Sequence, residues 1–572
     1  MENQGRFFIF LILSTLILVV WSQFAAPPPP PASTAGSIPA AASTAKSSGD
    51  VTSSSRVEKV VENVPPVRQA ADIPVRSVTI VTDDYEAVFS SRGAVLTGYS
   101  LARFKDRRTK EPVQLVHVHP EQPSPLTLSH PALPGLSTLP FEFVGESKKL
   151  STEGETHRLL FRARTSEGVW VEKSFIFTNG SYLFGYEVAV KNLGRRELPS
   201  GTMSMEWAPS LGIEEFTGTQ SQAGGLRVAT FAGGKMETQK TKKTREEVIV
   251  PAPVSWAALA DQFFVAALIP DPATPAGARV ARDFNAFLPA TEKELEPAID
   301  PKSFAPRPIL TYAVPSLLKG EAFRRSGRVF LGPQEYRPLK ELGLELDRVL
   351  DFGMFGFISV YMLKLLKIFF EWFGNWGLAI ILLSILVKIL LWWPTHSSYI
   401  HMSEMQRKMK DIQPQLEALK KKYANDRTKQ QQEMSVLYQK AGINPMGGCL
   451  PMLLQIPVFF ALYATLVHTV ELRGAPFILW IRDLSLRDPS YVLPLLMGVS
   501  MIVQQRVSGQ MGQSAQGGQQ KFMMWFFPVF LTAISMQWPS GLLLYWVVTN
   551  LLSIVQQKMV NRQLKKARIQ AK

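Results

Sequence analysis

The chain has 572 residues, a single cysteine and a formal net charge of +15. That length allows two or three domains, and one cysteine excludes a disulfide framework or a thiolate metal site within the chain. The charge suits either nucleic acid or a membrane protein with a basic cytoplasmic face, and long apolar segments favour the membrane. RNA-binding, zinc-ligand and phosphate-loop patterns do not occur in the sequence, and the seven histidines form no HExxH motif. We therefore expect no nucleic-acid specificity, no metal and no cofactor.

The N-terminus carries a short apolar run, 7–21, directly after Arg6. The run is short enough for a signal peptide, but no clear cleavage site follows and prolines begin almost at once, at 27–31. We predict an uncleaved transmembrane anchor at 1–23. The segment 24–70 is rich in Pro, Ala, Ser and Thr, which is typical of a linker.

Residues 75–340 have the pattern of a large β-domain. Segments 169–177 and 182–190 are typical strands, and they flank Asn179 and Gly180, a turn pair that favours a β-hairpin. Helical periodicity is scarce in this part of the chain. We predict an antiparallel all-β sandwich whose stability comes from its core, since it has no cysteine.

An amphipathic segment follows at 345–373. Lys364, Lys367 and Glu371 share one helical face, and the opposite face carries Phe357, Tyr361, Leu365 and Ile368. This pattern favours a helix that lies in the membrane interface. The alternative is a soluble helix that packs on the β-domain.

Five apolar spans are predicted at 375–394, 450–470, 491–505, 522–537 and 540–556. The segment 395–444 between the first two spans carries nine Lys or Arg residues, and the tail 557–572 carries six with no acid. Since basic segments stay in the cytoplasm, both chain ends should be cytoplasmic and the β-domain periplasmic. The last three spans are shorter than the roughly 20 residues that cross a bilayer, which suggests local thinning of the membrane.

Lys388 lies inside the first of these spans. A charge near mid-membrane is costly, so it should face a protein interior or a wet cavity, unless it snorkels to the headgroups near Trp393. Polar side chains also occur in and around the spans: Ser384, Gln455, Gln504 and Asn550. Singly, each is more often a helix–helix contact, but with Lys388 they suggest a hydrated cavity open to the cytoplasm.

The segment 395–444 predicts a cytoplasmic helical hairpin broken at Asn425 and Asp426, with Thr428 as a capping-box residue of the second helix. Methionines share a helical face ahead of it: Met402, Met405 and Met409. Such faces adapt to varied apolar partners, although these methionines could equally pack against the hairpin or lipid.

Catalytic constellations do not occur in the sequence: serines lack a GxSxG setting and the spans contain no paired carboxylates. We therefore expect no enzymatic activity. A solute transporter is a weaker alternative because the sequence has neither an inverted repeat nor an intramembrane acid for proton coupling.

Several motifs together resemble the YidC/Oxa1/Alb3 family of membrane insertases in its Gram-negative form. They are NWG at 375–377, the span with Lys388, NPMGGCLP at 444–451, QIP at 455–457, VELRGAPF at 470–477 and PSGLLLYW at 539–546. The resemblance is dense over 350–560 and looser over 75–340. Two positions depart from the family pattern, which usually has arginine at Lys388 and a tyrosine pair where Tyr545 and Trp546 stand.

The resemblance implies a five-helix insertase core with a hydrophilic groove, one anchor helix and a periplasmic β-supersandwich. The groove, with Lys388, Tyr545 and Trp546, would receive nascent membrane proteins, and the hairpin would help to recruit them. It also implies the Sec translocon, its accessory complex, membrane lipids and, through the basic tail, the ribosome as partners. On this basis we expect an inner-membrane insertase and chaperone that works alone or with Sec, the alternative being a scaffold for membrane complexes without autonomous insertion.

Overall fold

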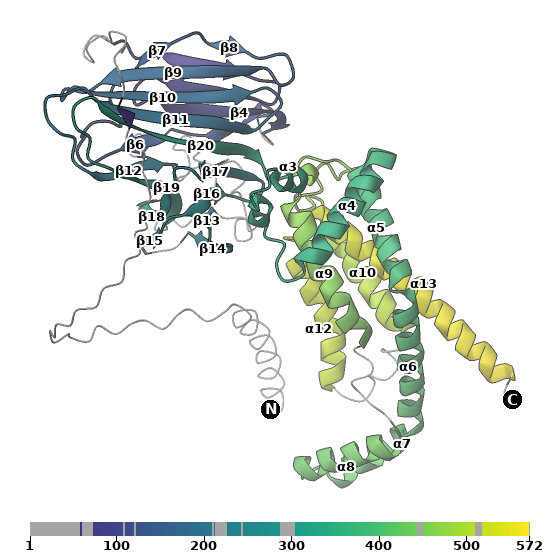
Figure 1. Ribbon diagram of the computed structural model, residues 1–572. Coiled ribbons are helices and arrows are strands. Elements are labelled where there is room, and N and C mark those ends of the chain that lie inside the picture. Colours follow the sequence, from purple (N-terminus) through teal and green to yellow (C-terminus); the bar gives the residue numbers. More distant parts are fainter. Residues whose placement is uncertain are drawn as a thin grey trace, which may run out of the picture.

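The computed structural model describes residues 58–59, 73–106, 109–118, 122–208, 211, 226–241, 244–285, 304–442, 450–508 and 518–570. The expected anchor at 1–23 lies outside this part of the chain, as does most of the expected linker at 24–70. Within the linker range, Glu58–Lys59 forms strand β1, which pairs with β20. An N-terminal β-part is joined to a C-terminal helical part (Figure 1).

The β-part is an all-β supersandwich of three sheets, as the sequence predicts. Its largest sheet has ten strands in the order β14-β13-β16-β17-β20-β11-β10-β9-β7, with β1 beside β20, and two five-stranded sheets have the orders β15-β18-β19-β12-β6 and β5-β4-β3-β2-β8. One correction concerns direction, since β2 and β8 pair in parallel. The strands are β2 Ser77–Val81, β3 Tyr85–Ser90, β4 Val95–Lys105, β5 Pro112–Val116, β6 Thr127–Ser129, β7 Glu142–Val144, β8 Lys148–Lys149, β9 Thr156–Arg164, β10 Val169–Thr178, β11 Leu183–Asn192, β12 Gly201–Glu206, β13 Arg227–Ala232, β14 Lys235–Lys240, β15 Glu247–Val250, β16 Val254–Ala260, β17 Phe264–Pro270, β18 Gly277–Asn285, β19 Phe304–Val314 and β20 Glu321–Pro333.

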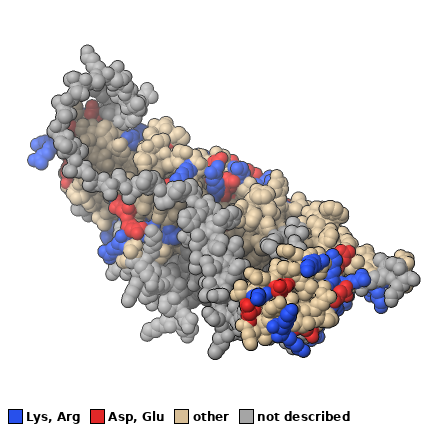
Figure 2. Space-filling model, turned by 90° about the horizontal axis from the view of Figure 1, so that it is seen from below, with Lys and Arg blue, Asp and Glu red and all other residues tan. Residues whose placement is uncertain are grey.

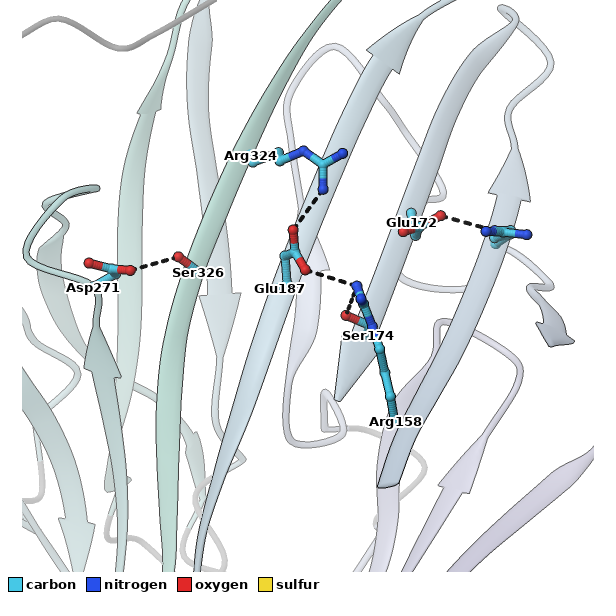
Figure 3. Close-up of polar contacts among 8 residues, drawn as sticks. Arg158, Glu172, Ser174, Glu187, Asp271, Arg324 and Ser326 are labelled. Carbon is cyan, nitrogen blue, oxygen red and sulfur yellow. Dashed lines mark hydrogen bonds and ion pairs between the residues drawn. The ribbon is translucent and has the colours of Figure 1, made fainter. Parts of the chain in front are cut away.

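The predicted hairpin is present as β10 and β11, paired from Val169 with Asn192 to Ile176 with Gly185. Alternation along these strands sends Phe175, Phe177 and Val188 into the core. The opposite face is polar: Glu187 on β11 pairs with Arg158 on β9 at 2.8 Å and with Arg324 on β20 at 2.7 Å (Figure 3). One apolar and one charged face give the sheet a buried and a solvated side.

The helical part contains α4 Gly356–Phe373, α5 Trp376–Leu390, α6 Trp392–Asp411, α7 Gln413–Lys422, α8 Arg427–Lys440, α9 Leu450–His468, α10 Val492–Val507, α12 Gly518–Ser535 and α13 Ser540–Gln570. Short helices α3 Tyr336–Glu341, η3 Leu346–Val349 and η5 Val470–Leu472 lie at its border with the β-part. By length and apolarity, none of the described helices qualifies alone as a membrane span, and one pair, α5 with α6, qualifies together across a 64° bend.

The helix bounds differ from the expected spans at two places. α13 continues for 31 residues through the expected boundary at 556, so 557–570 is a helical extension and not a separate tail. Its Asn561 Nδ2 donates to Val507 O of α10 at 2.8 Å, which ties the extension to the bundle. α12 begins at Gly518, four residues before the expected span at 522. Both helices are thus longer than the expected spans, but neither qualifies alone as a membrane span by length and apolarity, so the short apolar spans and the thinning they suggest stay predictions.

The amphipathic helix α4 packs against α5 and α9. Its buried side chains include Met362 and Leu366, whereas Phe357 and Tyr361 of the predicted apolar face are exposed. The hairpin is also present, as α7 and α8. In the view from below, Lys, Arg and acidic side chains are scattered among other residues (Figure 2). The cap of α8 differs from the prediction, because the Asp426 side chain, and not Thr428, accepts from the backbone of Lys429 at 3.0 Å.

A polar and apolar seam joins the β-part to the helical part. Gln262 of the β-part donates to Val467 O at the end of α9 over 2.9 Å, and Arg473 donates to Lys105 O over 2.8 Å. Val470 between them is fully buried within the β-domain core. Leu472, two residues later, is buried in the core of the helical part, so the segment that follows α9 lies between the two cores.

Candidate functional site

Lys388 lies near the C-terminal end of α5 and is 7% exposed. Its Nζ donates to Ser553 Oγ of α13 at 2.9 Å and lies 5.7 Å from the ring centre of Tyr399 on α6. The side chain thus points into the junction of three helices. A lysine that snorkels would extend out of the bundle, whereas the Lys388 side chain is buried between helices.

Tyr399 extends the polar contacts of the lysine. Ser553 and Gln504 of α10 lie beside its hydroxyl. Ser553 donates its one hydrogen to Thr549 O at 2.7 Å, which leaves its lone pairs free to accept from Lys388. Four helices therefore meet in one polar group, hereafter the lysine cluster: Lys388, Tyr399, Gln504 and Ser553.

Ser384 does not join the lysine cluster. It is buried one turn before Lys388, and its Oγ donates to Ile380 O of its own helix at 2.7 Å. A serine that bonds the carbonyl four residues back satisfies itself inside its helix. We assign Ser384 a local role in α5.

Gln455 and Tyr545 form a second contact, between α9 and α13. The Gln455 Nε2 donates to the Tyr545 hydroxyl at 2.6 Å, and Tyr545 is 2% exposed. Trp546, the next residue, stacks on Trp538 at 5.4 Å and meets the ring of Phe459 on α9 edge-on at 4.9 Å. The two neighbouring aromatics thus both face α9, one through its hydroxyl and one through its ring.

Asn550 makes a third contact, between α13 and α10. Its Nδ2 donates to Ser500 Oγ at 2.9 Å, and Ser500 in turn donates to Met497 O of its own helix at 2.7 Å. Both side chains are buried. α13 is therefore the element that the predicted residues share: it supplies Tyr545, Trp546 and Asn550 and receives Lys388 and Gln455.

The three methionines lie on α6, ahead of the hairpin α7–α8. Met402 is 5% exposed and packs in a small cluster with Tyr399 and Val560 of α13, so it is not available as a recruiting surface. Met405 and Met409 are half-buried. The prediction that all three form one adaptable face is wrong for Met402, because the α13 extension covers it.

Sequence reasoning missed Tyr399, Ser500 and Ser553. Ser553 follows Thr549 by one helical turn on α13, and this spacing could have indicated a polar stripe through Tyr545. Tyr399 had no such signal, because it falls just beyond the predicted end of the first span.

Among the described residues, no group of three or more His, Cys, Asp or Glu side chains could hold a metal ion. The described helices instead expose large apolar side chains: Phe460 on α9, Leu495 and Val499 on α10, Val529 on α12 and Leu551 on α13. Such surfaces suit an apolar surrounding.

Comparisons with known proteins cover both parts of the chain. The family described as 60Kd inner membrane protein matches residues 368–567, and the family described as YidC periplasmic domain matches residues 77–365.

Curated relatives match most of the length. "Membrane protein insertase YidC" of Syntrophus aciditrophicus (strain SB) is 32% identical over 506 residues, covering 86% of this chain and 87% of the relative. The protein of the same name from Nitratidesulfovibrio vulgaris (strain DP4) is 33% identical over 574 residues, covering 98% of this chain and all of the relative. A solved structure, "Active YidC insertase crystal structure with the first transmembrane domain resolved", covers 84% of this chain and 94% of its own at 16% identity, with a TM-score of 0.34. On the family matches and the curated relatives, this chain belongs to the YidC family of membrane protein insertases, inner-membrane proteins with a periplasmic domain whose substrates are nascent membrane proteins.

Proposed function

We propose that this insertase works without a covalent step, by drawing a short polar segment of its substrate toward Lys388 while the adjoining apolar segment moves into lipid. The observation that carries the proposal is the lysine cluster, a buried cation among hydroxyl and amide groups of four helices. A cation that costs about 3 kcal/mol to hold at mid-membrane should have a use there.

The chemistry of the lysine cluster suits transient binding. Lys388 has three donors and only one of them is used on Ser553, so an acidic side chain or a carbonyl of a passing segment can bind the others. Lysine offers a point charge where the family usually has a bidentate arginine, which favours loose contacts over fixed ones. Binding of this kind would lower the cost of carrying a short polar tail partway across the bilayer.

Burial of the substrate's apolar segment would then drive the reaction. Each buried methylene contributes about 0.8 kcal/mol, so a segment of some 20 apolar residues supplies ample free energy. Tyr545 and Trp546 face α9 and would line the path along α13. With this driving force, insertion would need neither a cofactor nor a chemical energy source.

The topology that we propose has both chain ends in the cytoplasm and the β-part in the periplasm. The supporting observation is charge: nine Lys or Arg residues in 395–444 and six in 557–572, against three in 471–490 that are offset by Glu471, Asp483 and Asp488. The β-part would contact the Sec accessory complex, and the basic end of α13 would contact the ribosome and anionic lipid.

Reconstitution into liposomes tests the role of Lys388. A single-span substrate with a short acidic outer tail is added to wild type, Lys388→Arg and Lys388→Glu, and protease protection of the tail is scored. We expect insertion by wild type and the arginine variant but not by the glutamate variant. Lys364→Glu on α4 is the matched control, because Lys364 is an exposed lysine outside the lysine cluster.

Two other outcomes would contradict parts of the proposed function. Equal insertion by all three proteins would remove Lys388 from the mechanism. Failure of folded wild type to insert the substrate without Sec would contradict autonomous insertion and favour a scaffold that works with the translocon.

A further inference from the structure

The bend between α5 and α6 interrupts the one helix pair that together qualifies as a membrane span among the described residues. α5 ends at Leu390 and α6 begins at Trp392, with 64° between their axes. Pro394 explains the break, since a proline has no N–H to bond the carbonyl four residues earlier and its ring clashes with it. α6 leads directly into α7 and α8 (Figure 1), so the angle at Leu391 decides where the hairpin stands.

Gln556 of α13 contacts the first turn of α6, directly after this break. Its Nε2 donates to Trp392 O at 3.1 Å and to Thr395 Oγ1 at 3.0 Å, and the side chain is fully buried. Thr395 Oγ1 lies 2.5 Å from Leu391 O, the carbonyl at the break itself. The amide and the threonine hydroxyl thus bond the residues on either side of Pro394.

Nearby amides of α13 have other partners. Gln557 donates to Ser403 Oγ at 3.3 Å, two turns further along α6, and Asn561 donates to Val507 O of α10 at 2.8 Å. Within the part of the chain that the structure describes, Gln556 is the α13 side chain with hydrogen bonds to 391–395. Gln556 therefore contacts the residues at the break, whereas Gln557 and Asn561 contact other parts of the helical bundle.

The lysine cluster depends on the same bend. Lys388 precedes the break and Tyr399 follows it, and both contact Ser553, which lies one turn before Gln556 on α13. If the angle at Leu391 opened, the two side chains could not both contact Ser553. A fixed bend is therefore a condition for this cluster as well as for the position of the hairpin.

We propose that Gln556 is a positioning residue that holds the α5–α6 bend, and through it the orientation of the hairpin α7–α8 and the geometry around Lys388 during insertion. The inference rests on the proposed function for its effect on substrate, but the bend itself can be measured separately. α13 suits this task because it is one continuous helix of 31 residues that contacts α5, α6 and α10.

Electron-spin distance measurements in nanodiscs test the positioning. In a Cys449→Ser background, labels are placed at Val436 of α8 and Val499 of α10, both exposed. Wild type should give one narrow distance distribution. Gln556→Leu, which keeps the volume but not the amide, should broaden the distribution roughly twofold or shift its mean.

The partner residue provides the conservative comparison. Thr395→Val should broaden the distribution as Gln556→Leu does, Thr395→Ser should keep it narrow, and the double variant should go no further than either single one. Asn561→Leu is the matched control, since it removes an α13 amide that bonds α10. If Gln556→Leu does not fold, the comparison of Thr395→Val with Thr395→Ser still tests whether this hydrogen bond holds the bend.

Insertion is measured on the same proteins, with Lys388→Glu alongside. We expect Gln556→Leu to insert about fivefold more slowly, as the loss of one or two hydrogen bonds implies. An unchanged distance distribution in Gln556→Leu and Thr395→Val, or a broadened one with full insertion, would overturn the proposal. Normal insertion by Lys388→Glu would refute the proposed role of Lys388, while the distances would still test Gln556.

Discussion

Lys388 on α5 and Ser553 on α13 are joined by a 2.9 Å hydrogen bond across 165 positions of the chain. The ring of Tyr399 lies 5.7 Å from the same ammonium, so the serine hydroxyl and the aromatic ring both contact the cation. Without Ser553, the ammonium would remain buried while losing its hydrogen-bonded partner.

Ser553→Ala should therefore impair insertion while the protein stays folded. We expect a reduction of about tenfold or more for a substrate with an acidic tail, as for the loss of one hydrogen bond to a charged group. Ser553→Thr keeps the hydroxyl and should insert normally. Ser535→Ala serves as control, because Ser535 is equally buried but bonds Thr532 O of its own helix. Equal loss in both alanine variants would point to general destabilisation.

Local patterns in the sequence predict much of the fold. Alternation and the Asn179-Gly180 turn predict the β10–β11 hairpin, and apolar runs predict the positions of α5, α9, α10 and α12. These features depend on residues that are close in sequence, so one chain is enough to find them.

Contacts that depend on distant residues were not predictable in this way. The partner of Lys388 lies on another helix, and a single serine in an apolar segment has no distinctive pattern. The α13 extension looked like a polar tail because its stabilising contact, Asn561 with Val507 O, is tertiary. The same extension buries Met402, which the helical spacing alone had grouped with Met405 and Met409.

Met402→Ala and Met405→Ala should have different effects. Met402 fills the space between Tyr399 and Val560, so its truncation should cost about 2 to 4 kcal/mol and lower the melting temperature of the detergent-solubilised protein. Met405 is half-buried and outside that cluster, so its truncation should cost less. A similar loss in both variants, measured by scanning fluorimetry, would contradict the distinct role of Met402.

Lys173 is a buried lysine in the core of the β-part. Its Nζ donates to Gly93 O and to Leu126 O, each at 2.9 Å, and so ties the β3–β4 turn to the segment before β6. Burial lowers the pKa of Lys173 from its ordinary 10.5 to about 7. A neutral amine has two N–H groups, which match the two carbonyls.

The stability of the β-part should therefore rise with pH above about 7. Between that value and 10.5 the unfolded chain binds more protons at this lysine than the folded chain, which adds up to about 1.4 kcal/mol of stability per pH unit. Lys173→Met removes this contribution. Hydrogen exchange of β10 and β11 peptides, compared between the two proteins at each pH, should show a difference that grows from pH 7 to 9. A difference independent of pH would contradict the assignment.

The seam between the two parts carries a charge pair that should control their docking. Lys367 of α4 forms an ion pair with Glu471 after α9, both sides being partly buried. Glu335, at the end of the β-part, lies nearby: burial and then the negative charge of Glu471 raise its pKa, while Lys367 lowers it. The lysine thus compensates two carboxylates at once.

Lys367→Gln should loosen the seam, and more so at pH 8 than at pH 5, which lies just above the ordinary glutamate pKa of 4.5. A carboxyl group with a raised pKa binds more protons in the docked state, so docking weakens as pH rises through that pKa, and loss of Lys367 removes the compensating charge. Hydrogen exchange of peptides over 464–473 should increase at both pH values, with the larger increase at pH 8. Lys364→Gln replaces an exposed lysine on the same helix and should leave the exchange unchanged at both pH values.

Glu335→Gln in the Lys367→Gln background should restore most of the protection at pH 8, because a neutral amide has no charge to repel Glu471. A loss of protection in Lys367→Gln, relative to wild type at the same pH, that was equal at pH 5 and pH 8 would contradict the role given to Glu335.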